Sequence, residues 1–300
     1  MTKRQLEVTS TEAGTRVDRL IAEKHEGISR RALGLLFADG LVLVNGRRAR
    51  KGDRVHVGDQ VTFNPEDASV AARPASAGGV LLALVTSDLI VMNKPAGVPS
   101  TAVPGRVDGT AAGQLLTLFP ELAGVGYGAR EPGLVHRLDT QTSGLLLAAR
   151  HAEAFSALQQ QLRAGAIEKK YLAIAVGIAP AAGRVDSPLE PDPSHPRRVR
   201  VATERQAGRS TEFRRLEVAG GHSLLEVTLA RGYRHQIRAH LASVGLPLAG
   251  DVLYGGPPSG LSPRHALHAS SLVCSTGPFP FQVEAGLPED LRQFWSRLAD

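Results

Sequence analysis

The spacing of apolar residues predicts a small module of two helices and a hairpin near the start of the chain. Apolar positions within 17–21 recur at helical spacing behind Thr15, a candidate N-cap. A second helical pattern follows Ser29, another candidate cap, and ends before Gly40. The apolar run 41–44 then meets Asn45-Gly46, the strongest short hairpin signal. These elements predict a compact domain over residues 10–63.

A larger region follows, in which strand and helix patterns alternate irregularly. Residues 64–80 are rich in Ala, Pro, Ser and Gly without apolar periodicity, which is typical of a linker. The irregular order favours an α+β fold over a doubly wound sheet for residues 81–300. The pattern predicts strands at 89–92, 145–149, 171–176 and 224–229, and helices at 111–119, 151–163 and 234–244.

Composition narrows the class of protein. The chain has 300 residues, of which 42% are hydrophobic, and its formal net charge is +6, which makes a polyanionic partner plausible. A single cysteine, Cys274, excludes an intrachain disulfide and a site of several thiolates. The polar first ten residues lack the apolar core of a signal peptide, and no apolar run is long enough to span a bilayer. We therefore expect a cytoplasmic protein that does not bind membranes, and a monomer.

Four separated motifs carry the chemical signal. The segment His136 to Gly144 places Asp139 in a short polar loop before an apolar strand, the kind of position where catalytic groups occur. In chain order, the set closely resembles the motifs of RluA-type RNA pseudouridine synthases. The matching segments are 93–97, 136–144, 169–173, and 234–242 with 250–255. The resemblance implies a mixed, largely antiparallel sheet in the catalytic domain.

By this resemblance, Asp139 is the catalytic residue and uridine in RNA is the substrate. The reaction breaks the glycosidic bond, turns the base and rejoins the sugar through a ring carbon, so no cofactor is implied. An ionised carboxylate can attack the anomeric carbon or take a proton from the neighbouring sugar carbon, and both routes remain open. Taken alone, Asp139 also fits a turn residue that caps the amides of Thr142 and Ser143.

Three further residues gain roles from the same resemblance. Arg238 supplies the cation that keeps Asp139 ionised, although its position also fits a helix-surface arginine. Tyr171 lies against the target base and assists proton transfer, although a strand tyrosine is more often a core residue. Arg137 fills the stack that the flipped uridine vacates, or instead binds a backbone carbonyl.

The N-terminal module resembles the S-four-like RNA-binding domain in the order of its elements. Two arginines in the first turn of its second helix oppose the helix dipole, and more cations follow in the hairpin, which suggests a surface for phosphates. The alternative is a solvated charged face. The candidate RNA-binding cations are Arg30, Arg31, Arg47, Arg48, Arg50 and Lys51.

Together the two resemblances imply an RNA pseudouridine synthase acting on structured RNA, with large-subunit ribosomal RNA as the expected target. The rival from another class is a non-catalytic RNA-binding or ribosome-assembly factor on the same fold. A glycoside or nucleoside hydrolase would need a second carboxylate, which no motif supplies. The histidines show no metal-ligand spacing, so we predict no metal site. One departure is Tyr233, which stands where the family motif usually has an arginine.

Overall fold

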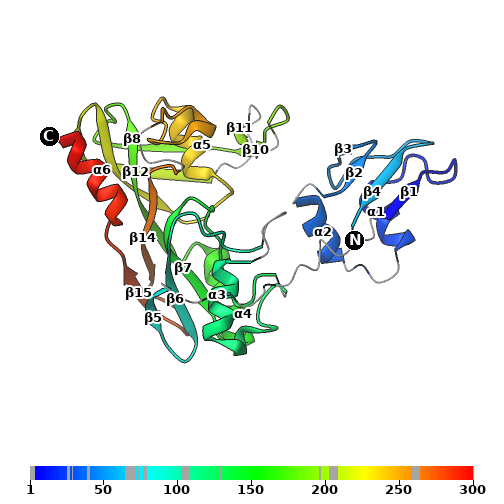
Figure 1. The fold of residues 1–300 in the computed structure, drawn as a ribbon, viewed down its shortest axis with the longest axis horizontal. Coiled ribbons are helices and arrows are strands. Elements are labelled where there is room, and N and C mark those ends of the chain that lie inside the picture. The colour runs from blue at the N-terminus through cyan, green and yellow to red at the C-terminus, as the bar shows by residue number, and fades with distance from the viewer. Residues whose placement is uncertain are drawn as a thin grey trace. The chain divides into compact units, whose positions relative to one another are not determined.

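The computed structural model divides into two compact units, Met1–Ala71 and Ala72–Asp300 (Figure 1). It describes residues 4–25, 28, 30–38, 41–64, 72, 75–76, 80–102, 108–128, 130–195, 197–202, 209–258 and 264–299. Ser29 and Gly40, predicted as helix boundaries, lie outside these residues, as does most of the predicted linker 64–80. Within that linker, Ala72 packs in the core of the larger unit.

The smaller unit contains two helices and a four-stranded sheet. Helices α1 (Val17–Lys24) and α2 (Arg30–Ala38) bury the apolar positions that the spacing predicted. The sheet order is β1-β4-β2-β3, with bounds Arg4–Glu7, Gln60–Phe63, Leu43–Val44 and Arg47–Arg48 for the four strands in that order. One shared core of apolar side chains joins both helices to the sheet.

Two local predictions in this unit have different outcomes. The N-cap of α1 is Arg16, whose side chain makes no capping bond, so the prediction that Thr15 caps the helix was wrong. The hairpin turn was predicted correctly. Asn45 and Gly46 both have positive φ, at 52° and 75°, as a type I′ turn requires. The Asn45 amide also bonds to Asp59 at 2.7 Å, which fixes the turn to the following loop.

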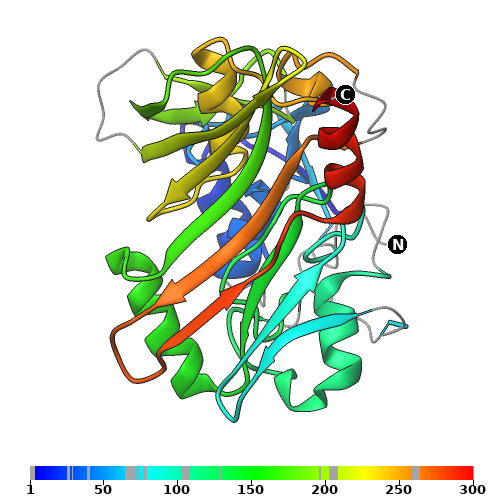
Figure 2. The same cartoon turned by 90° about the vertical axis from the view of Figure 1, so that its left-hand side faces the viewer.

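The larger unit is built on a nine-stranded sheet, which is antiparallel except where β7 and β14 run parallel (Figure 2). The strand order is β5-β6-β7-β14-β8-β13-β12-β9, and β15 pairs with β14. The bounds are β5 Leu81–Val85, β6 Leu89–Lys94, β7 Ser143–Ala149, β8 Glu168–Val176, β9 Ala182–Ser187, β12 Arg209–Ala219, β13 His222–Leu229, β14 Leu267–Cys274 and β15 Phe281–Glu284. A separate hairpin pairs β10 (Leu189–Pro191) with β11 (Val199–Val201).

Helices cover both faces of this sheet. On one face, α3 (Ala111–Leu118) and α5 (Gln236–Ser243) share a core with alternate residues of the central strands. On the other, α4 (Ala152–Ala164) and α6 (Glu289–Ala299) pack in two further clusters. In Figure 2, α6 is the red helix at the C-terminus. The predicted α+β fold with a largely antiparallel sheet is confirmed.

A glycine fixes the point where the Asp139 loop enters the sheet. Gly144 has φ +113°, and a Cβ built there would lie 2.2 Å from the backbone oxygen of Ala269. Any side chain would therefore separate β7 from β14, where the two strands pair. The backbone after the loop is thus held at an approach that only glycine permits.

Candidate active site

Asp139 lies in the loop before β7, and both of its neighbours along the chain are anchored. The Ser100 hydroxyl accepts from the amide of Leu138 at 3.0 Å and donates to its carbonyl at 2.7 Å. On the other side, the fully buried Lys94 donates to the carbonyl of Thr140 at 3.3 Å. A loop held on both sides presents its carboxylate in one geometry, as a reacting group needs.

The carboxylate of Asp139 is paired with the guanidinium of Arg238, which comes from α5. Nη1 of Arg238 donates to Oδ2 of Asp139 at 3.0 Å. Nε and Nη2 of the same guanidinium donate to the two oxygens of Asp251, at 2.7 and 2.9 Å. The Arg238 side chain is 7% exposed, so it is not the helix-surface arginine that its sequence position also allowed. Its orientation is fixed by Asp251, which leaves one nitrogen directed at Asp139.

The charges around Asp139 favour its ionised form. Burial alone would raise the pKa of the carboxyl, but His235, Arg238 and His265 face it and lower the pKa below its ordinary value. Of these three, Arg238 is the one that is charged at neutral pH. Burial lowers the pKa of His235 to about 4 and that of His265 to about 4, so both imidazoles are neutral at pH 7. Asp139 is therefore an anion at neutral pH.

The side chain of Asp139 does not act as a turn cap. The amide of Thr142 donates to the main-chain oxygen of Asp139 at 3.0 Å, and the carboxylate is directed to Arg238 instead. Among the described residues, Oδ1 of Asp139 accepts no hydrogen bond, and 26% of the side chain is exposed. One oxygen is thus restrained while the other is available to a substrate.

His235 lies beside the same carboxylate. Its Nε2 is 3.8 Å from Oδ2 of Asp139, and its Nδ1 is 2.9 Å from the hydroxyl of Tyr254. The backbone of His235 has φ +55° at the N-cap of α5, a left-handed conformation that is uncommon for residues other than glycine. Tyr254 also packs its ring against Arg238, 5.0 Å from the guanidinium carbon to the ring centre.

Tyr171 and Arg137 lie near this group in different environments. Tyr171 is buried on β8, and burial together with the charge of Asp139 raises the pKa of its phenol. No hydrogen bond to its hydroxyl occurs in the described part of the chain. Arg137 precedes Leu138 and has 57% of its side chain exposed, with Glu131 at 4.0 Å as its nearest carboxylate. It does not bind a backbone carbonyl of any described residue.

A match to a family model identifies the protein family of this chain. Residues 88–243, which include Asp139 and Arg238, match the model described as RNA pseudouridylate synthase. The chain belongs to this family. Residues 15–61 match the model of the S4 domain, so the predicted resemblance of the smaller unit is confirmed as well.

Relatives within the family match over nearly the whole chain. An uncharacterized RNA pseudouridine synthase of Chloroflexus aurantiacus is 37% identical, over 99% of this chain and 94% of the relative. The ribosomal large subunit pseudouridine synthase D of Xanthomonas campestris pv. campestris is 34% identical, over 99% of this chain and 93% of the relative. These proteins are isomerases that act on RNA, and so is this one.

Solved structures agree with the fold. The human RNA pseudouridylate synthase domain containing 4 superimposes with a TM-score of 0.57 at 23% identity, over 72% of this chain and 92% of that protein. The human RNA pseudouridylate synthase domain containing 1 gives 0.54 at 24% identity, over 75% and 97% of the two chains. Both comparisons support the pseudouridine synthase architecture of the larger unit.

Some residues of the site have roles that the sequence did not assign. Asp251 and Tyr254 lie in a segment that matched the family, but nothing in their spacing indicated that they hold Arg238. His235 lies in a matched motif, but its approach to Asp139 depends on a backbone conformation that sequence patterns do not predict. Local sequence patterns could not predict these contacts, because the residues meet only through packing of α5 on the sheet.

The RNA-binding candidates of the smaller unit lie on its surface. Arg30, Arg47, Arg48, Arg50 and Lys51 are exposed, and among the described residues none pairs with a carboxylate. The backbone of Arg31 lies in α2, and its side chain is outside what the structure describes. These cations remain candidates.

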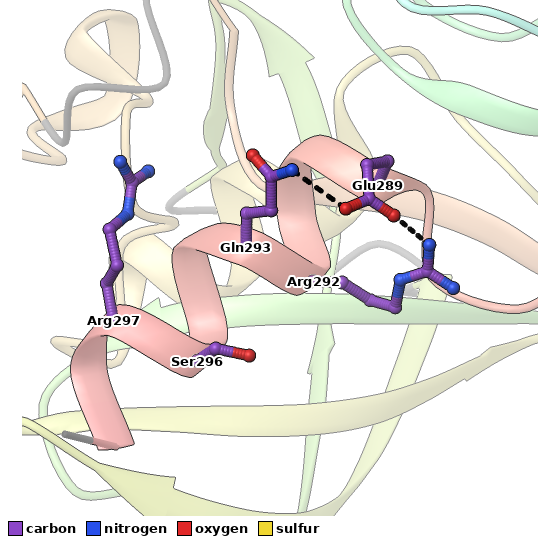
Figure 3. A pocket seen from close by; sticks show the side chains of 5 residues that line it. All are labelled: Glu289, Arg292, Gln293, Ser296 and Arg297. Atoms are coloured by element: carbon purple, nitrogen blue, oxygen red, sulfur yellow. Dashed lines mark hydrogen bonds and ion pairs between the residues drawn. The ribbon is translucent and has the colours of Figure 1, made fainter.

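Other features of the described residues offer no competing site. A surface hollow on α6 is lined by Glu289, Arg292, Gln293, Ser296 and Arg297 (Figure 3). All five come from one helix, and Glu289 bonds to Arg292 and Gln293 within it. Across the described ranges, no group of three or more His, Cys, Asp or Glu residues is arranged to hold a metal ion. No helix there is long and apolar enough to cross a membrane.

Proposed function

We propose that this RNA pseudouridine synthase modifies uridines of large-subunit ribosomal RNA, with Asp139 as the catalytic residue. One observation carries the assignment of Asp139. Its Oδ2 is restrained by Arg238 at 3.0 Å, while the described residues leave Oδ1 without a donor. The ribosomal target is supported by relatives named ribosomal large subunit pseudouridine synthase D, in Xanthomonas campestris and Neisseria meningitidis among others.

Asp139 begins the reaction as a carboxylate. In one route its free oxygen bonds to C1′ of the uridine as the bond from C1′ to N1 breaks, and uracil leaves with the electron pair. In the other route the carboxylate takes a proton from C2′ as the same bond breaks. In the first route C5 of the turned uracil then displaces the Asp139 oxygen from C1′, so that bond breaks as the bond from C1′ to C5 forms. In the second route C5 bonds to C1′ as C2′ regains its proton from Asp139. In both, the C5 proton is lost and N1 gains one. Arg238 keeps Asp139 ionised in either route.

Two other side chains complete the proposed site. Tyr171 packs against the uracil, and the raised pKa of its phenol keeps it protonated and able to donate a hydrogen bond. Arg137, exposed next to the catalytic loop, enters the RNA stack when the uridine leaves it. Both roles follow from the family resemblance and are compatible with the observed exposure of each residue.

The smaller unit is proposed to bind the same RNA. Its exposed cations form no salt bridge with a described carboxylate, so their charges can bind phosphate. They are Arg30, Arg47, Arg48, Arg50 and Lys51. Arg31 follows Arg30 in the first turn of α2 and belongs to the proposed surface. We also propose two domains joined by the linker 64–80. The first extends the predicted 10–63 to include β1, and the second spans 81–300 with Ala72 packed in its core. A cytoplasmic location and a monomeric state are proposed as well.

Mapping pseudouridines across ribosomal RNA tests this function. RNA from cells that lack the gene should miss one or more pseudouridines of the large subunit. The wild-type gene should restore them, and Asp139→Asn should not, because a neutral amide can neither attack C1′ nor accept a proton.

A matched control is Asp88→Asn, which alters a half-buried carboxylate that bonds to His151 at 3.0 Å. This variant should restore the modification. Restoration by Asp139→Asn would instead favour the non-catalytic alternative, in which the protein binds RNA or assists ribosome assembly without turnover. If only transfer RNA loses a pseudouridine, the enzyme assignment stands and the ribosomal target is wrong.

A further inference from the structure

Lys169 is a buried cation that the catalytic group does not use. Its residue exposure is 4%, and its Nζ donates to the carbonyl of Ala230 at 3.2 Å. An ammonium has three donors, yet no other bond from Nζ and no salt bridge occurs within the described ranges. Burial, together with the charge of Arg209, lowers the pKa of Lys169 to about 8. A buried ammonium with so few partners is costly unless an anion joins it.

A second cation lies beside the first. The guanidinium of Arg209 is 5.2 Å from the ring centre of Tyr233, and its Nη1 donates to the carbonyl of Gly232 at 3.3 Å. Arg209 makes no salt bridge with any residue that the structure describes. Lys169 and Arg209 therefore bind the same short turn, 230–233, which leads from β13 into α5. Two like charges meet there without a described carboxylate.

The strand register places both cations on the face of the sheet that carries Tyr171. Tyr171 pairs with Val227, which pairs with Phe213, so these three side chains share a face. Lys169 lies two residues before Tyr171 on β8, and Arg209 lies four residues before Phe213 on β12. Because side chains alternate along a strand, both cations point to that same face. The charge of Asp139 acts on Tyr171, so the reacting carboxylate is close to this face.

We propose that Lys169 and Arg209 form a phosphate site, which binds the RNA backbone next to the uridine that reaches Asp139. The inference rests on the proposed function in taking RNA as the ligand. A phosphate would supply the acceptors that Lys169 lacks and would offset the repulsion between the two cations. Arg209 presents a planar guanidinium that is already oriented by the Tyr233 ring, so little conformational entropy is lost on binding. The site positions the RNA strand while Asp139 acts on the sugar.

Measurement of RNA affinity against salt concentration tests the proposal. The full-length protein is titrated with a transcript of large-subunit ribosomal RNA, as wild type, Lys169→Gln and Arg209→Gln. Removing either cation should weaken binding about tenfold and reduce the slope of log K against log salt by up to about 1. The apparent KM should rise more than kcat falls.

The neighbouring cations provide matched controls. Lys170 and Arg214 lie on β8 and β12 as well, but their side chains point to the opposite face and pair with Glu226, at 4.0 and 3.2 Å. Lys170→Gln and Arg214→Gln should keep the wild-type slope. Slopes of the Lys169 and Arg209 variants equal to those of these controls would overturn the phosphate site.

Two further measurements separate this proposal from folding defects and from the proposed function. If Lys169→Gln unfolds, the half-buried Arg209→Gln carries the test, and a wild-type slope in that variant contradicts the proposal. Lys169→Arg keeps the positive charge and should keep the wild-type slope. If the wild-type protein forms no pseudouridine but the salt slope still depends on Arg209, the phosphate site stands and the proposed function fails. If pseudouridine forms and the slope is insensitive to both residues, the function stands and the site fails.

Discussion

The two units of this protein use cations in opposite ways. In the larger unit, Arg238 is buried and all three of its hydrogen-bonding nitrogens are held by Asp139 and Asp251. In the smaller unit, Arg47, Arg48 and neighbouring cations are exposed and pair with no described carboxylate. Arg238 is thus fixed in one geometry, whereas the exposed cations of the smaller unit keep their charge available to bind a polyanion.

The difference predicts different consequences of mutation. Removing one partner of a buried ion pair leaves an unpaired charge and costs about 3–5 kcal/mol, whereas an exposed pair contributes about 0–1 kcal/mol. A buried pair also sets the protonation state of the group beside it. Substitutions at Arg238 should therefore change chemistry and stability, and those in the smaller unit should change association with RNA.

Among the cations of the two units, the largest effect is expected at Arg238. Arg238→Gln removes the cation between Asp139 and Asp251, so the free energy of unfolding should fall by about 3 kcal/mol and the single-turnover rate by at least about 100-fold. Because burial then acts on Asp139 without Arg238, its pKa should rise and the acid limb of the rate profile should move to higher pH. Urea unfolding and the rate profile measure these changes.

Arg234→Gln is the matched control, since this exposed arginine precedes α5 and donates to the carbonyl of Arg197 at 2.6 Å. Its unfolding free energy should stay within about 0.5 kcal/mol of wild type. If Arg238→Gln keeps the unfolding free energy and the acid limb of the wild type, the contrast drawn between the cations of the two units is wrong.

Acidification should also weaken the larger unit. Burial lowers the pKa values of His235, His265 and His268 to about 4, from an ordinary 6.5. The unfolded chain then binds protons between these values while the folded chain does not, so stability falls as pH drops from about 6.5 to 4. Each histidine contributes roughly 1–3 kcal/mol to this loss.

The lowered pKa of Asp139 acts in the same direction at lower pH, since its contribution disappears as pH falls below the ordinary 3.8. Urea unfolding at pH 7, 6 and 5 measures the histidine effect. A free energy of unfolding for the larger unit that is constant between pH 7 and pH 5 would show that these imidazoles are not held neutral by the fold.

An intermediate effect is expected at His235. His235→Asn keeps a residue that tolerates positive φ but removes the imidazole beside Asp139. We expect kcat to fall about tenfold with little change in KM, because the carboxylate loses the imidazole that lies 3.8 Å from its Oδ2. The acid limb of the rate profile should also shift. If the variant keeps the wild-type kcat and pH–rate profile, His235 contributes only its backbone conformation to the turn.

The smallest effect on the chemical step is expected in the smaller unit. Replacing Arg47, Arg48, Arg50 and Lys51 by Gln should weaken RNA binding and reduce the salt slope by about 1 for each phosphate that the variant no longer binds. The rate at saturating RNA should change little. The control replaces Arg16 and Arg19, which already pair with Asp18 and Glu23. If the quadruple variant keeps the wild-type salt slope, this surface does not bind RNA.

The elements that the sequence predicted are those whose apolar residues recur with one clear helical or strand period. Helix α4 has an apolar face and ends at Gly165 in the left-handed conformation, as its pattern indicated. Strand β12 was not predicted, because charged residues interrupt it and its apolar residues are few. Its pairing with β13, and not its own hydrophobicity, stabilises it.

The pairing of Asp139 with Arg238 was predicted, and only through family resemblance. Asp139 and Arg238 are 99 positions apart, and no spacing rule joins them. Asp251 lies in a matched segment but had no predicted role, because its two bonds to Arg238 depend on the turn after α5. Lys169 also lies in a matched motif, and its burial became evident only in the folded sheet. Local sequence patterns do not predict residues whose role depends on tertiary packing.

The rate of pseudouridine formation in a single turnover, with enzyme in saturating excess over RNA, tests the central claim most directly. For Asp139→Asn we predict a fall of at least about 1,000-fold, with the dissociation constant for RNA within about threefold of wild type. A rate within about tenfold of wild type would contradict the assignment of this carboxylate as the group that acts on the sugar.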